Sequence, residues 1–263
     1  MLVFRGKPSF SFSPNPTLAY LYRRFLANRL VDGLAPGRFL EVGVGRGRFF
    51  EDLVAHGFHG LCLDLNPVLI RELEADPGLK AWPVQFKAQD FFELDEQFEL
   101  IVAFEVLEHY EQDSECLQKW KKLLASHGEL ILSVPAHMSQ WTQNDSNAGH
   151  ARRYEKEELA YKLRASGFRI DALLCYGFPL LNFTYPLSSG ARREPTRSIL
   201  TGAEDPRMAD WQKTAQSGDR SYAGLSSWLF CELVWFPWLH AQRPFLSGDL
   251  GTGYIVRCTA TQA

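Results

Sequence analysis

The chain has 263 residues, of which 46% are hydrophobic, and its 28 basic and 31 acidic residues give a net charge of -3. This length fits one large α/β domain, or a domain of about 180 residues with an elaboration. Because the charges nearly cancel, the chain has no basic field to attract nucleic acid, and we expect no nucleic-acid partner.

The cysteines favour a reducing compartment. Their number is odd and none are spaced as C-x-x-C, so they predict buried, reduced thiols, without a disulfide framework or a zinc site: Cys62, Cys116, Cys175, Cys231 and Cys258. Residues 1–8 contain no apolar core of signal-peptide length. No window approaches the ~18 uninterrupted apolar residues that a membrane span needs. We therefore expect a cytoplasmic protein.

A helix is expected near the start of the chain. Asn15-Pro16 is a typical start signal, and apolar residues then recur on one helical face, at Leu18, Leu21, Phe25 and Leu26. Such a helix is suited to covering one edge of a sheet.

Residues 38–50 contain the strongest motif. An apolar run ends in Glu41 and is followed by Gly43, Gly45 and Gly47, then by apolar residues at helical spacing, which predicts a strand, a tight loop and a helix. Glycine lacks a Cβ atom, so the loop can adopt positive φ and let a ligand lie against its backbone, beside the positive end of the helix. The dinucleotide fingerprint G-x-G-x-x-G requires a third glycine where this chain has Arg48.

Residues 60–65 predict a second buried strand, which brings Asp64 to the carboxyl edge of the sheet. Open α/β sheets bind their ligands at that edge, and the glycine loop lies there too. A carboxylate in this place can accept hydrogen bonds from both ribose hydroxyls of a nucleoside, whichever cofactor carries it. Alternatively, Asp64 caps the helix that Pro67 begins.

The third and fourth predicted strands, over residues 84–88 and 98–104, end in acidic residues at the same edge. Asp90 follows the third strand, where an acidic turn residue is also common. The phrase E-V-L-E-H, from Glu105 to His109, follows the fourth. His109 is either a base or orienting group, or a loop histidine that is hydrogen-bonded to the backbone.

The next segment is expected to be a helix followed by a strand and a long loop. Asp113 or Ser114 caps the helix, which ends at His127-Gly128, and residues 129–135 form the fifth strand. Residues 136–154 are polar and aromatic, without a helical or strand period. Long ordered loops of this kind are usually functional.

Two arginines near the end of that loop allow two interpretations. Arg152 or Arg153 can hold a carboxylate or phosphate through paired hydrogen bonds. Alternatively, they pair with acidic residues that steady the next helix, namely Glu155, Glu157 and Glu158.

The sixth and seventh strands are predicted over residues 168–174 and 252–258, with a long insertion between them. Residues 188–218 are rich in Gly, Pro, Ser and charge and predict a mobile loop. Residues 228–239 are apolar and aromatic but too short to span a bilayer. One interpretation is a helix that is buried against the core or against a second copy of the chain. The other is an aromatic lid over an apolar acceptor, or an anchor at a membrane surface.

Taken together, these motifs resemble the class I S-adenosylmethionine-dependent methyltransferases. The resemblance rests on Glu41 with its G-x-G-x-G loop, on Asp64 and Asp90, on E-V-L-E-H, and on the S-V-P that closes the fifth strand. E-V-L-E-H is typical of the type 11/12 and ubiquinone-biosynthesis-like small-molecule branch. The implied fold is a Rossmann-like α/β three-layer sandwich with a seven-stranded, mostly parallel sheet and a terminal antiparallel hairpin.

The resemblance also implies a division of the chain and a cofactor. Residues 37–176 and 250–263 form the domain that binds S-adenosylmethionine. Residues 1–36 form a lead and a helix that often closes over the cofactor in this family, and residues 177–249 are an insertion.

The resemblance implies roles for individual residues. Asp64 holds the ribose, Asp90 accepts from the adenine amino group, and the backbone N–H of Phe91 donates to the ring. The cofactor contacts as a whole are Glu41, Gly43, Val44, Gly45, Gly47, Asp64, Leu65, Asp90, Phe91, Phe104, Glu105 and His109. Phe104 departs from the small or sulfur-containing residue that is frequent at its position.

Substrate contacts are expected from the loop before the sixth strand. Its G-H-x-R-R-Y phrase recurs in this branch of the family, and the implied contacts are Trp141, His150, Arg152, Arg153 and Tyr154. A hydroxyl acceptor needs a base within hydrogen-bond reach, for which His109, His137 and His150 are the candidates. No metal is expected, because no paired carboxylates or His/Cys ligand spacing stands out.

The leading hypothesis is an enzyme that transfers a methyl group from S-adenosylmethionine directly to a small-molecule or lipid-like acceptor. Two alternatives remain: an NAD-dependent oxidoreductase on a related sheet, and a non-catalytic scaffold protein that binds the cofactor. Residues 228–239 also suggest peripheral membrane contact or a homodimer.

Overall fold

The computed structural model describes residues 17–189 and 232–261. Three predictions lie wholly or partly outside these ranges: the start signal at Asn15-Pro16, residues 190–218 of the expected mobile loop, and residues 228–231 of the aromatic stretch, together with Cys231.

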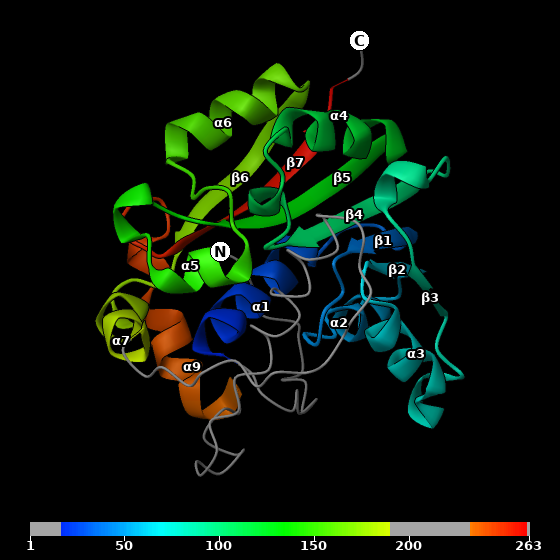
Figure 1. Ribbon diagram of the computed structural model, residues 1–263, viewed down its shortest axis with the longest axis horizontal. Coiled ribbons are helices and arrows are strands. Elements are labelled where there is room, and N and C mark those ends of the chain that lie inside the picture. The colour runs from blue at the N-terminus through cyan, green and yellow to red at the C-terminus, as the bar shows by residue number, and fades with distance from the viewer. Residues whose placement is uncertain (1–16, 190–231, 262–263) are drawn as a thin grey trace.

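Seven strands form one sheet in the order β3-β2-β1-β4-β5-β7-β6 (Figure 1). All neighbours are parallel except β7, which runs antiparallel to both β5 and β6. The predicted sheet with its terminal antiparallel hairpin is therefore confirmed. The strands are β1 (Arg38–Val42), β2 (His59–Asp64), β3 (Val84–Ala88), β4 (Phe98–Phe104), β5 (Leu124–Pro135), β6 (Phe168–Tyr176) and β7 (Gly253–Ala260).

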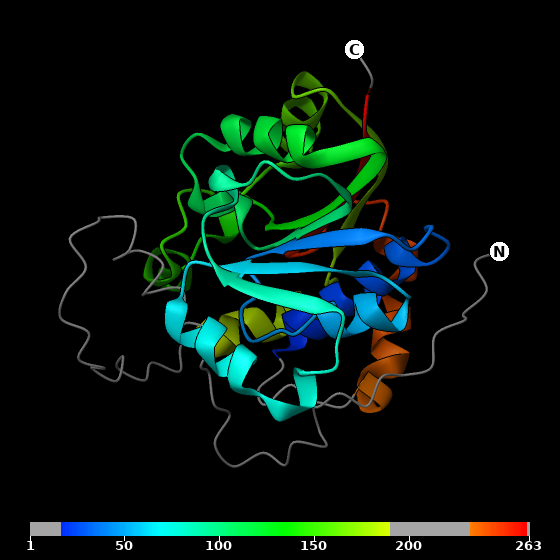
Figure 2. The same cartoon turned by 90° about the vertical axis from the view of Figure 1, so that its right-hand side faces the viewer.

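Helices cover both faces of the sheet, as Figures 1 and 2 show. Alternate residues of a strand point to opposite faces, so Leu40 and Val42 join one core with α4 and α6, and Phe39 joins the other with α1, α2 and α3. These two cores make the three layers of the predicted sandwich. The helices are α1 (Leu18–Val31), α2 (Phe50–Ala55), α3 (Pro67–Ala75), α4 (Asp113–Leu123), α5 (Gln143–Ala148), α6 (Lys156–Ala165), α7 (Leu180–Ser189) and α9 (Glu232–Ala241).

Several predicted boundaries are wrong. Thr17 caps α1 by accepting a hydrogen bond from Tyr20 N at 3.2 Å, so the helix begins after the expected start signal. Helix α4 is preceded by Gln112 and ends at Leu123. The expected stop at His127-Gly128 instead lies inside β5, because that strand already pairs with β4 at Leu124.

The loop over residues 136–154 is more regular than its composition suggests. It contains a short 3-10 turn, η4 (Met138–Gln140), and helix α5. Thr142 and Asp145 form a capping box that starts α5, with Thr142 N donating to Asp145 Oδ2 at 2.7 Å. The T-x-x-D spacing is the sequence pattern of this capping box. The helix was nevertheless not predicted, because it has few apolar residues.

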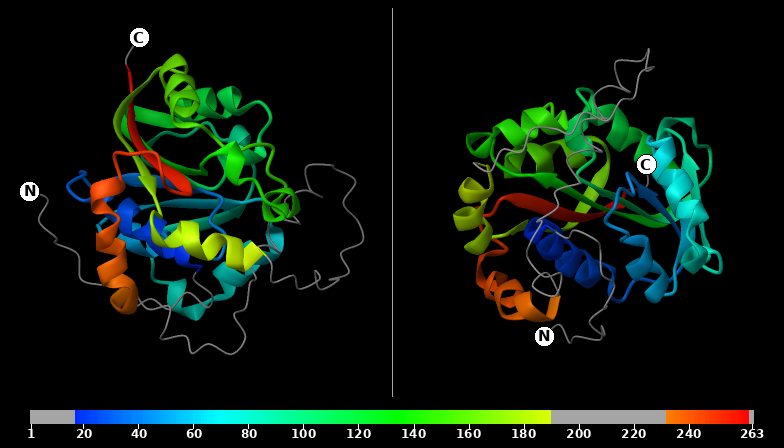
Figure 3. Two further views of the ribbon diagram at one scale, coloured as in Figure 1. Left: turned by 90° about the vertical axis from the view of Figure 1, so that its left-hand side faces the viewer. Right: turned by 60° about the horizontal axis from the view of Figure 1, so that its bottom comes forward.

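Helix α9 of the insertion packs beside α1 (Figure 3). Helix α9 confirms a helix in the aromatic stretch from residue 232 onwards, and its Leu239 has no exposed surface. Tyr22 O–H of α1 donates to Trp238 O at 3.3 Å, and the rings of Phe25 and His240 lie 5.1 Å apart. Helix α7 was not predicted, and it includes residues 188–189 of the expected loop.

Among the residues that the structure describes, no helix combines the length and apolarity needed to cross a bilayer. The four cysteines in these ranges are unpaired and buried, as predicted for them: Cys62, Cys116, Cys175 and Cys258.

Candidate active site

The glycine loop offers bare backbone at the carboxyl end of β1. Gly43 and Gly45 have φ values of 70° and 51°, which favour glycine. A Cβ atom built on Gly45 would meet only Gly43 O, at 3.8 Å, so this face of the loop is open. Tyr20 of α1 lies at its far end, where the phenol O–H donates to Gly47 O. Gly43 N and Val44 N each donate to Leu63 O at 2.9 Å, which ties the loop to β2.

Glu41 lies beneath this loop. Its side chain is buried, Phe50 N at the start of α2 donates to it, and Cys62 Sγ lies 3.8 Å from Oε2. Burial raises the pKa of Glu41 to about 8. The carboxyl group therefore fixes the loop to α2 and does not lie on the open face of the loop.

Asp64 joins the loop to the end of β2. Its Oδ2 accepts from Gly45 N at 3.0 Å and its Oδ1 from Asn66 N at 2.9 Å, and burial raises its pKa. Helix α3 is capped by Asn66, whose Oδ1 accepts from Val68 N at 2.9 Å. The alternative role of Asp64 as the cap of that helix is therefore wrong. Leu65, the next residue, is half-buried.

The acid after β3 acts as a turn residue in this structure. Asp90 Oδ1 accepts from Phe92 N at 3.0 Å and caps the short turn η2 (Phe91–Glu93). The Phe91 ring is buried, with the ring of Phe92 stacked on it at 4.5 Å. Asp90 itself is half-buried, so its carboxylate is still accessible from the sheet edge.

Glu105 follows β4 with φ of 54°, a conformation that is unusual for a residue with a side chain. Ser133 O–H donates to its Oε1 at 2.9 Å, and Arg23 of α1 pairs with the same oxygen at 3.2 Å. Arg23 also lies over the ring of Phe104, 5.8 Å from its centroid. Arg23 and Tyr20 were not predicted as site residues, because the residues that they contact at the sheet edge are remote in the chain.

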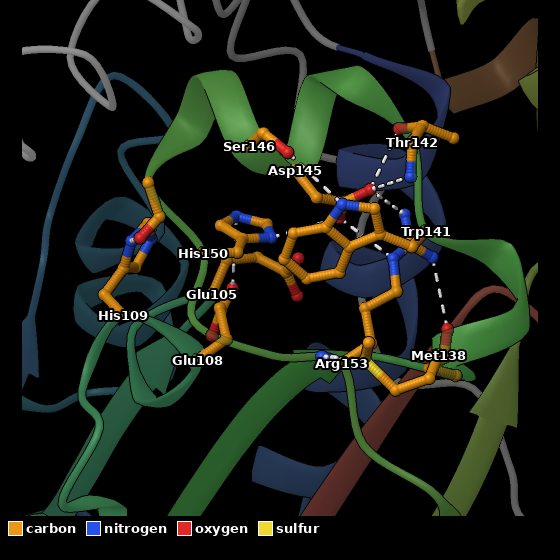
Figure 4. Close-up of polar contacts among 12 residues, drawn as sticks. Glu105, Glu108, His109, Met138, Trp141, Thr142, Asp145, Ser146, His150 and Arg153 are labelled. Carbon is orange, nitrogen blue, oxygen red and sulfur yellow. Dashed lines mark hydrogen bonds and ion pairs between the residues drawn. The ribbon is translucent and has the colours of Figure 1, made fainter.

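The structure brings His109 and His150 together, with their ring centroids 4.9 Å apart (Figure 4). His109 Nδ1 lies 3.3 Å from Gly149 O, and burial, followed by the neighbouring His150, lowers the pKa of His109 to about 4. Its ring is therefore uncharged near neutral pH and hydrogen-bonded to backbone. His150 Nδ1 lies 3.1 Å from Asp145 Oδ1.

Glu108, for which no role was predicted, completes this cluster. Its side chain has no exposed surface, and its Oε1 lies 3.8 Å from His150 Nε2. Burial, and then the charge of Glu105, raise the pKa of the Glu108 carboxyl well above its ordinary value. As the second acid of E-V-L-E-H, Glu108 could have been singled out from the sequence. Its neighbour His150 could not, because it lies far away in the sequence.

Both arginines of the loop are engaged by the protein itself. Arg153 is buried and makes two 2.9 Å hydrogen bonds to Asp145, besides donating to Ala136 O at 3.1 Å (Figure 4). Arg152 donates to Asp113 Oδ2 at 3.2 Å and to Glu111 O at 2.7 Å. The alternative pairing with Glu155, Glu157 and Glu158 is therefore wrong, and the contacts found here order the loop.

These contacts also fix the charge of Asp145. Burial by itself raises the pKa of Asp145, but hydrogen bonds from His150 and Arg153 outweigh it and hold the pKa below its ordinary range. The carboxylate is therefore ionised, and it connects the arginine to the histidine cluster.

The remaining predicted residues of the loop lie around this core. Tyr154 is buried, and its O–H donates to Asp113 at 2.9 Å. Trp141 donates from its indole N–H to Ser146 Oγ at 3.2 Å (Figure 4). His137 has a separate set of contacts, with Nδ1 3.0 Å from Glu155 and its ring 5.6 Å from that of Tyr254. The three histidines thus fall into two groups.

Residues 17–173 match a protein family described as "Methyltransferase domain". The chain belongs to this family. It is an S-adenosylmethionine-dependent methyltransferase, and the open backbone at Gly45 and the partly buried carboxylate of Asp64 are suited to that cofactor. None of the curated proteins matches the methyltransferase sequence.

Solved structures share the fold of this methyltransferase. A putative methyltransferase from Bacillus halodurans C-125 is 12% identical, with a TM-score of 0.57 over 90% of this chain and 99% of that one. The 1,6-didemethyltoxoflavin-N1-methyltransferase of Burkholderia thailandensis, solved with its namesake compound and S-adenosylhomocysteine, is 17% identical, with a TM-score of 0.54 over 93% and 79% of the chains. The cyclase SpnF is 17% identical, with a TM-score of 0.55 over 92% and 81%. At these identities the likeness shows the fold and not the acceptor.

An open cleft of about 520 Å³ lies elsewhere on the methyltransferase, beside the edge strand β3. Its lining shares no residue with the predicted site: Leu73, Glu74, Leu79, Lys80, Val84, Gln85, Phe86 and Lys87.

Proposed function

We propose that this methyltransferase acts on a small-molecule or lipid-like acceptor that enters at the carboxyl ends of β4 and β5. Glu108 and His109 of the E-V-L-E-H turn meet the segment just after α5 there, and Val106 of the same turn lies against Gly43 of the glycine loop. The Burkholderia thailandensis structure, which was solved with a small molecule and S-adenosylhomocysteine bound, supports an acceptor of this size. E-V-L-E-H further supports the type 11/12, ubiquinone-biosynthesis-like branch. Family membership favours this hypothesis over an NAD-dependent oxidoreductase.

The proposed cofactor site is built from three strand ends. The backbone of the glycine loop, from Gly43 to Gly47 and including Val44, supports the amino-acid part of the cofactor. Asp64, with Leu65 beside it, binds the ribose, because a carboxylate oxygen that already accepts from a backbone N–H, as Oδ1 and Oδ2 do from Asn66 and Gly45, can accept a further hydrogen bond. Asp90 and the backbone N–H of Phe91 bind the adenine.

Around the reacting atoms, we assign positions to residues at the end of β4. Phe104, Glu105 and His109 line the side of the cofactor next to the acceptor, and Glu41 supports the loop from beneath. Trp141, His150, Arg152, Arg153 and Tyr154 belong to the acceptor side, where the last three order the loop through Asp113 and Asp145.

When bound, S-adenosylmethionine supplies an electrophilic methyl group on a positively charged sulfur. The protein therefore needs chiefly to align the acceptor with that methyl group and to exclude water, and such alignment can contribute about 7–11 kcal/mol in well-oriented systems. An acceptor hydroxyl also has to lose a proton. His150 and His109 lie at the acceptor side and are the proposed proton acceptors, whereas His137 belongs to another cluster.

We also propose the division of the chain that the sequence suggested. Residues 37–176 and 250–263 bind the cofactor, residues 1–36 lead into it, and residues 177–249 are an insertion whose helix α9 packs on α1. Phe236 and Trp238 of α9 are 44% and 49% exposed, which supports contact with a membrane surface or a second copy through residues 228–239. Buried, unpaired thiols support a cytoplasmic location.

The observation that carries the proposal is the open backbone of Gly45, and calorimetry with S-adenosylmethionine and S-adenosylhomocysteine tests it. We expect both to bind the wild-type protein and Gly45→Val to lose binding at least tenfold, because its branched side chain enters the space above the loop. Gly33→Val is the matched control, since Gly33 also has positive φ and open surroundings but lies in the turn after α1. Equal affinity for wild type and Gly45→Val would remove the loop from the site. Binding without methyl transfer to any of a broad panel of acceptors would favour the scaffold hypothesis.

A further inference from the structure

Glu108 is a buried carboxyl group without a hydrogen-bond partner. It has no exposed surface, and neither Oε1 nor Oε2 makes a hydrogen bond within the described residues. Leaving a buried polar group unpaired costs about 1–3 kcal/mol, and more for a charged one, so such a group calls for an explanation. The side chain is directed at His150, whose Nε2 lies 3.8 Å from Oε1. This separation is too long for a hydrogen bond.

The two histidines present the arrangement that metal ligands have in proteins. One ligand atom each from Glu108, His109 and His150 lies within 4.8 Å of the other two. A metal-binding histidine usually gives its other ring nitrogen to a carboxylate or a backbone carbonyl, which orients the ring. His150 does so with Asp145, at 3.1 Å, and His109 with Gly149 O, at 3.3 Å.

The separations suit an ion between the three side chains. Zinc lies about 2.0–2.2 Å from imidazole nitrogen and carboxylate oxygen, so two ligand atoms on one ion are about 3.3–3.6 Å apart at tetrahedral angles and at most about 4.4 Å apart. The 3.8 Å between His150 Nε2 and Glu108 Oε1 falls within this limit. The orienting groups are themselves held in place, since Asp145 accepts two hydrogen bonds from Arg153 and one from Thr142 N (Figure 4).

A second group of similar composition does not have these features. His137, Cys175 and Asp249 also lie close together. However, Cys175 Sγ accepts from Gly251 N at 3.0 Å and Asp249 accepts from Tyr254 O–H at 2.6 Å, so both already have protein partners. His137 Nε2 is buried and makes no hydrogen bond, but within the described residues only the group at Glu108 contains a side chain with no exposed surface whose ligand atoms both lack one.

We propose that Glu108, His109 and His150 bind one divalent transition-metal ion, with Zn²⁺ the best match to two imidazoles and a carboxylate. Three protein ligands leave a coordination position open. The use of that position rests on the proposed function: it orients a hydroxyl or other oxygen donor of the acceptor beside the cofactor. The ion site itself is independent of the cofactor. No metal was predicted from the sequence, since no local ligand spacing stands out and the three side chains come from two segments about 40 residues apart in the chain.

Cobalt provides a direct readout, because Co²⁺ in a nitrogen and oxygen site absorbs visible light. The full chain, stripped of metal with a chelator, is titrated with Co²⁺ and then with Zn²⁺. We expect an absorption band that saturates at one Co²⁺ per chain and is abolished by one equivalent of Zn²⁺. Elemental analysis of the dialysed protein gives the same stoichiometry for Zn²⁺.

Two variants locate the site. Glu108→Gln and His150→Gln are each expected to weaken Zn²⁺ binding at least tenfold and to change or abolish the cobalt band. His137→Gln, the matched control from the same loop, keeps both properties. Thermal melting and calorimetry with S-adenosylhomocysteine show whether Glu108→Gln is folded. No saturable binding of either ion to the wild type, or an unchanged band in both folded variants, overturns the metal site. Cobalt binding without cofactor binding would instead refute the proposed function and leave the metal site standing.

Discussion

Glu41 shows how burial changes the pKa of a single residue at the carboxyl edge of the sheet. In the folded protein its pKa is about 8, against an ordinary value near 4.5, because the carboxyl group is removed from water. Between these two pH values the folded chain keeps a proton that the unfolded chain has lost. The protonated Glu41 carboxyl therefore contributes to stability, and this contribution is fully present below pH ~4.5. Between pH ~4.5 and 8 the free energy of unfolding falls by about 1.4 kcal/mol per pH unit, until the contribution is lost as the pH rises through 8.

We therefore expect Glu41→Gln to remove a pH dependence. The amide keeps the shape of the side chain and can still accept from Phe50 N, but it does not ionise. Urea unfolding of the cofactor-free protein at several pH values from 5 to 9 measures the effect. The stability of the variant relative to wild type should increase as the pH rises, whereas Glu74→Gln, an exposed position, should follow wild type. Parallel curves for wild type and Glu41→Gln would show that Glu41 does not hold this proton.

At the scale of elements, the loop over residues 136–154 depends on one buried ion pair. Arg153 and Asp145 connect α5 to the end of β5 through Ala136 O. Removing one partner of a buried pair leaves an uncompensated charge, which typically costs about 3–5 kcal/mol. Arg152 is different, because its partner Asp113 also accepts from Lys162 and Tyr154 and would not be left alone.

The two arginines should accordingly respond differently to the same change. We expect Arg153→Met to lower the free energy of unfolding by about 3–5 kcal/mol and Arg152→Met by about 1 kcal/mol. Urea unfolding at neutral pH measures both. Equal losses would mean that the Asp145 pair does not organise the loop. Arg153→Lys should recover only part of the loss, since an ammonium group cannot make the two parallel hydrogen bonds.

The elements of the sheet could be predicted because their signals are local. Apolar runs closed by Glu41, Asp64 and Pro135 predict strands and their carboxyl ends directly. Helix α5 could not be found from periodicity, since it has few apolar residues and is stabilised by its cap and by Arg153. The boundary between α4 and β5 was misplaced because Gly128 looks like a helix stop, whereas pairing with β4 decides that the strand starts earlier.

At the scale of the whole molecule, the site is assembled from segments that are far apart in the sequence. The sequence predicted that the ends of β1, β2 and β4 meet at one edge, because the order of parallel strands requires it. It did not predict that α1 brings Tyr20 to Gly47 and Arg23 to Glu105. Those contacts depend on how α1 packs, and α1 in turn packs on α9 from the insertion (Figure 3). No short-range pattern carries that information.

This arrangement predicts that α9 stabilises α1 and, through α1, the contact between Tyr20 and the glycine loop. Leu239 has no exposed surface and lies in the core shared with α1, so Leu239→Ala should lower stability by about 2–5 kcal/mol. Trp238→Ala, at a half-exposed neighbouring position, should cost clearly less. Hydrogen exchange measured by mass spectrometry should show faster exchange in α1 and α9 of Leu239→Ala, with β3 at the far edge of the sheet unchanged. Unaltered exchange in α1 would mean that α9 does not stabilise α1. The contact between α1 and the glycine loop would then be independent of the insertion.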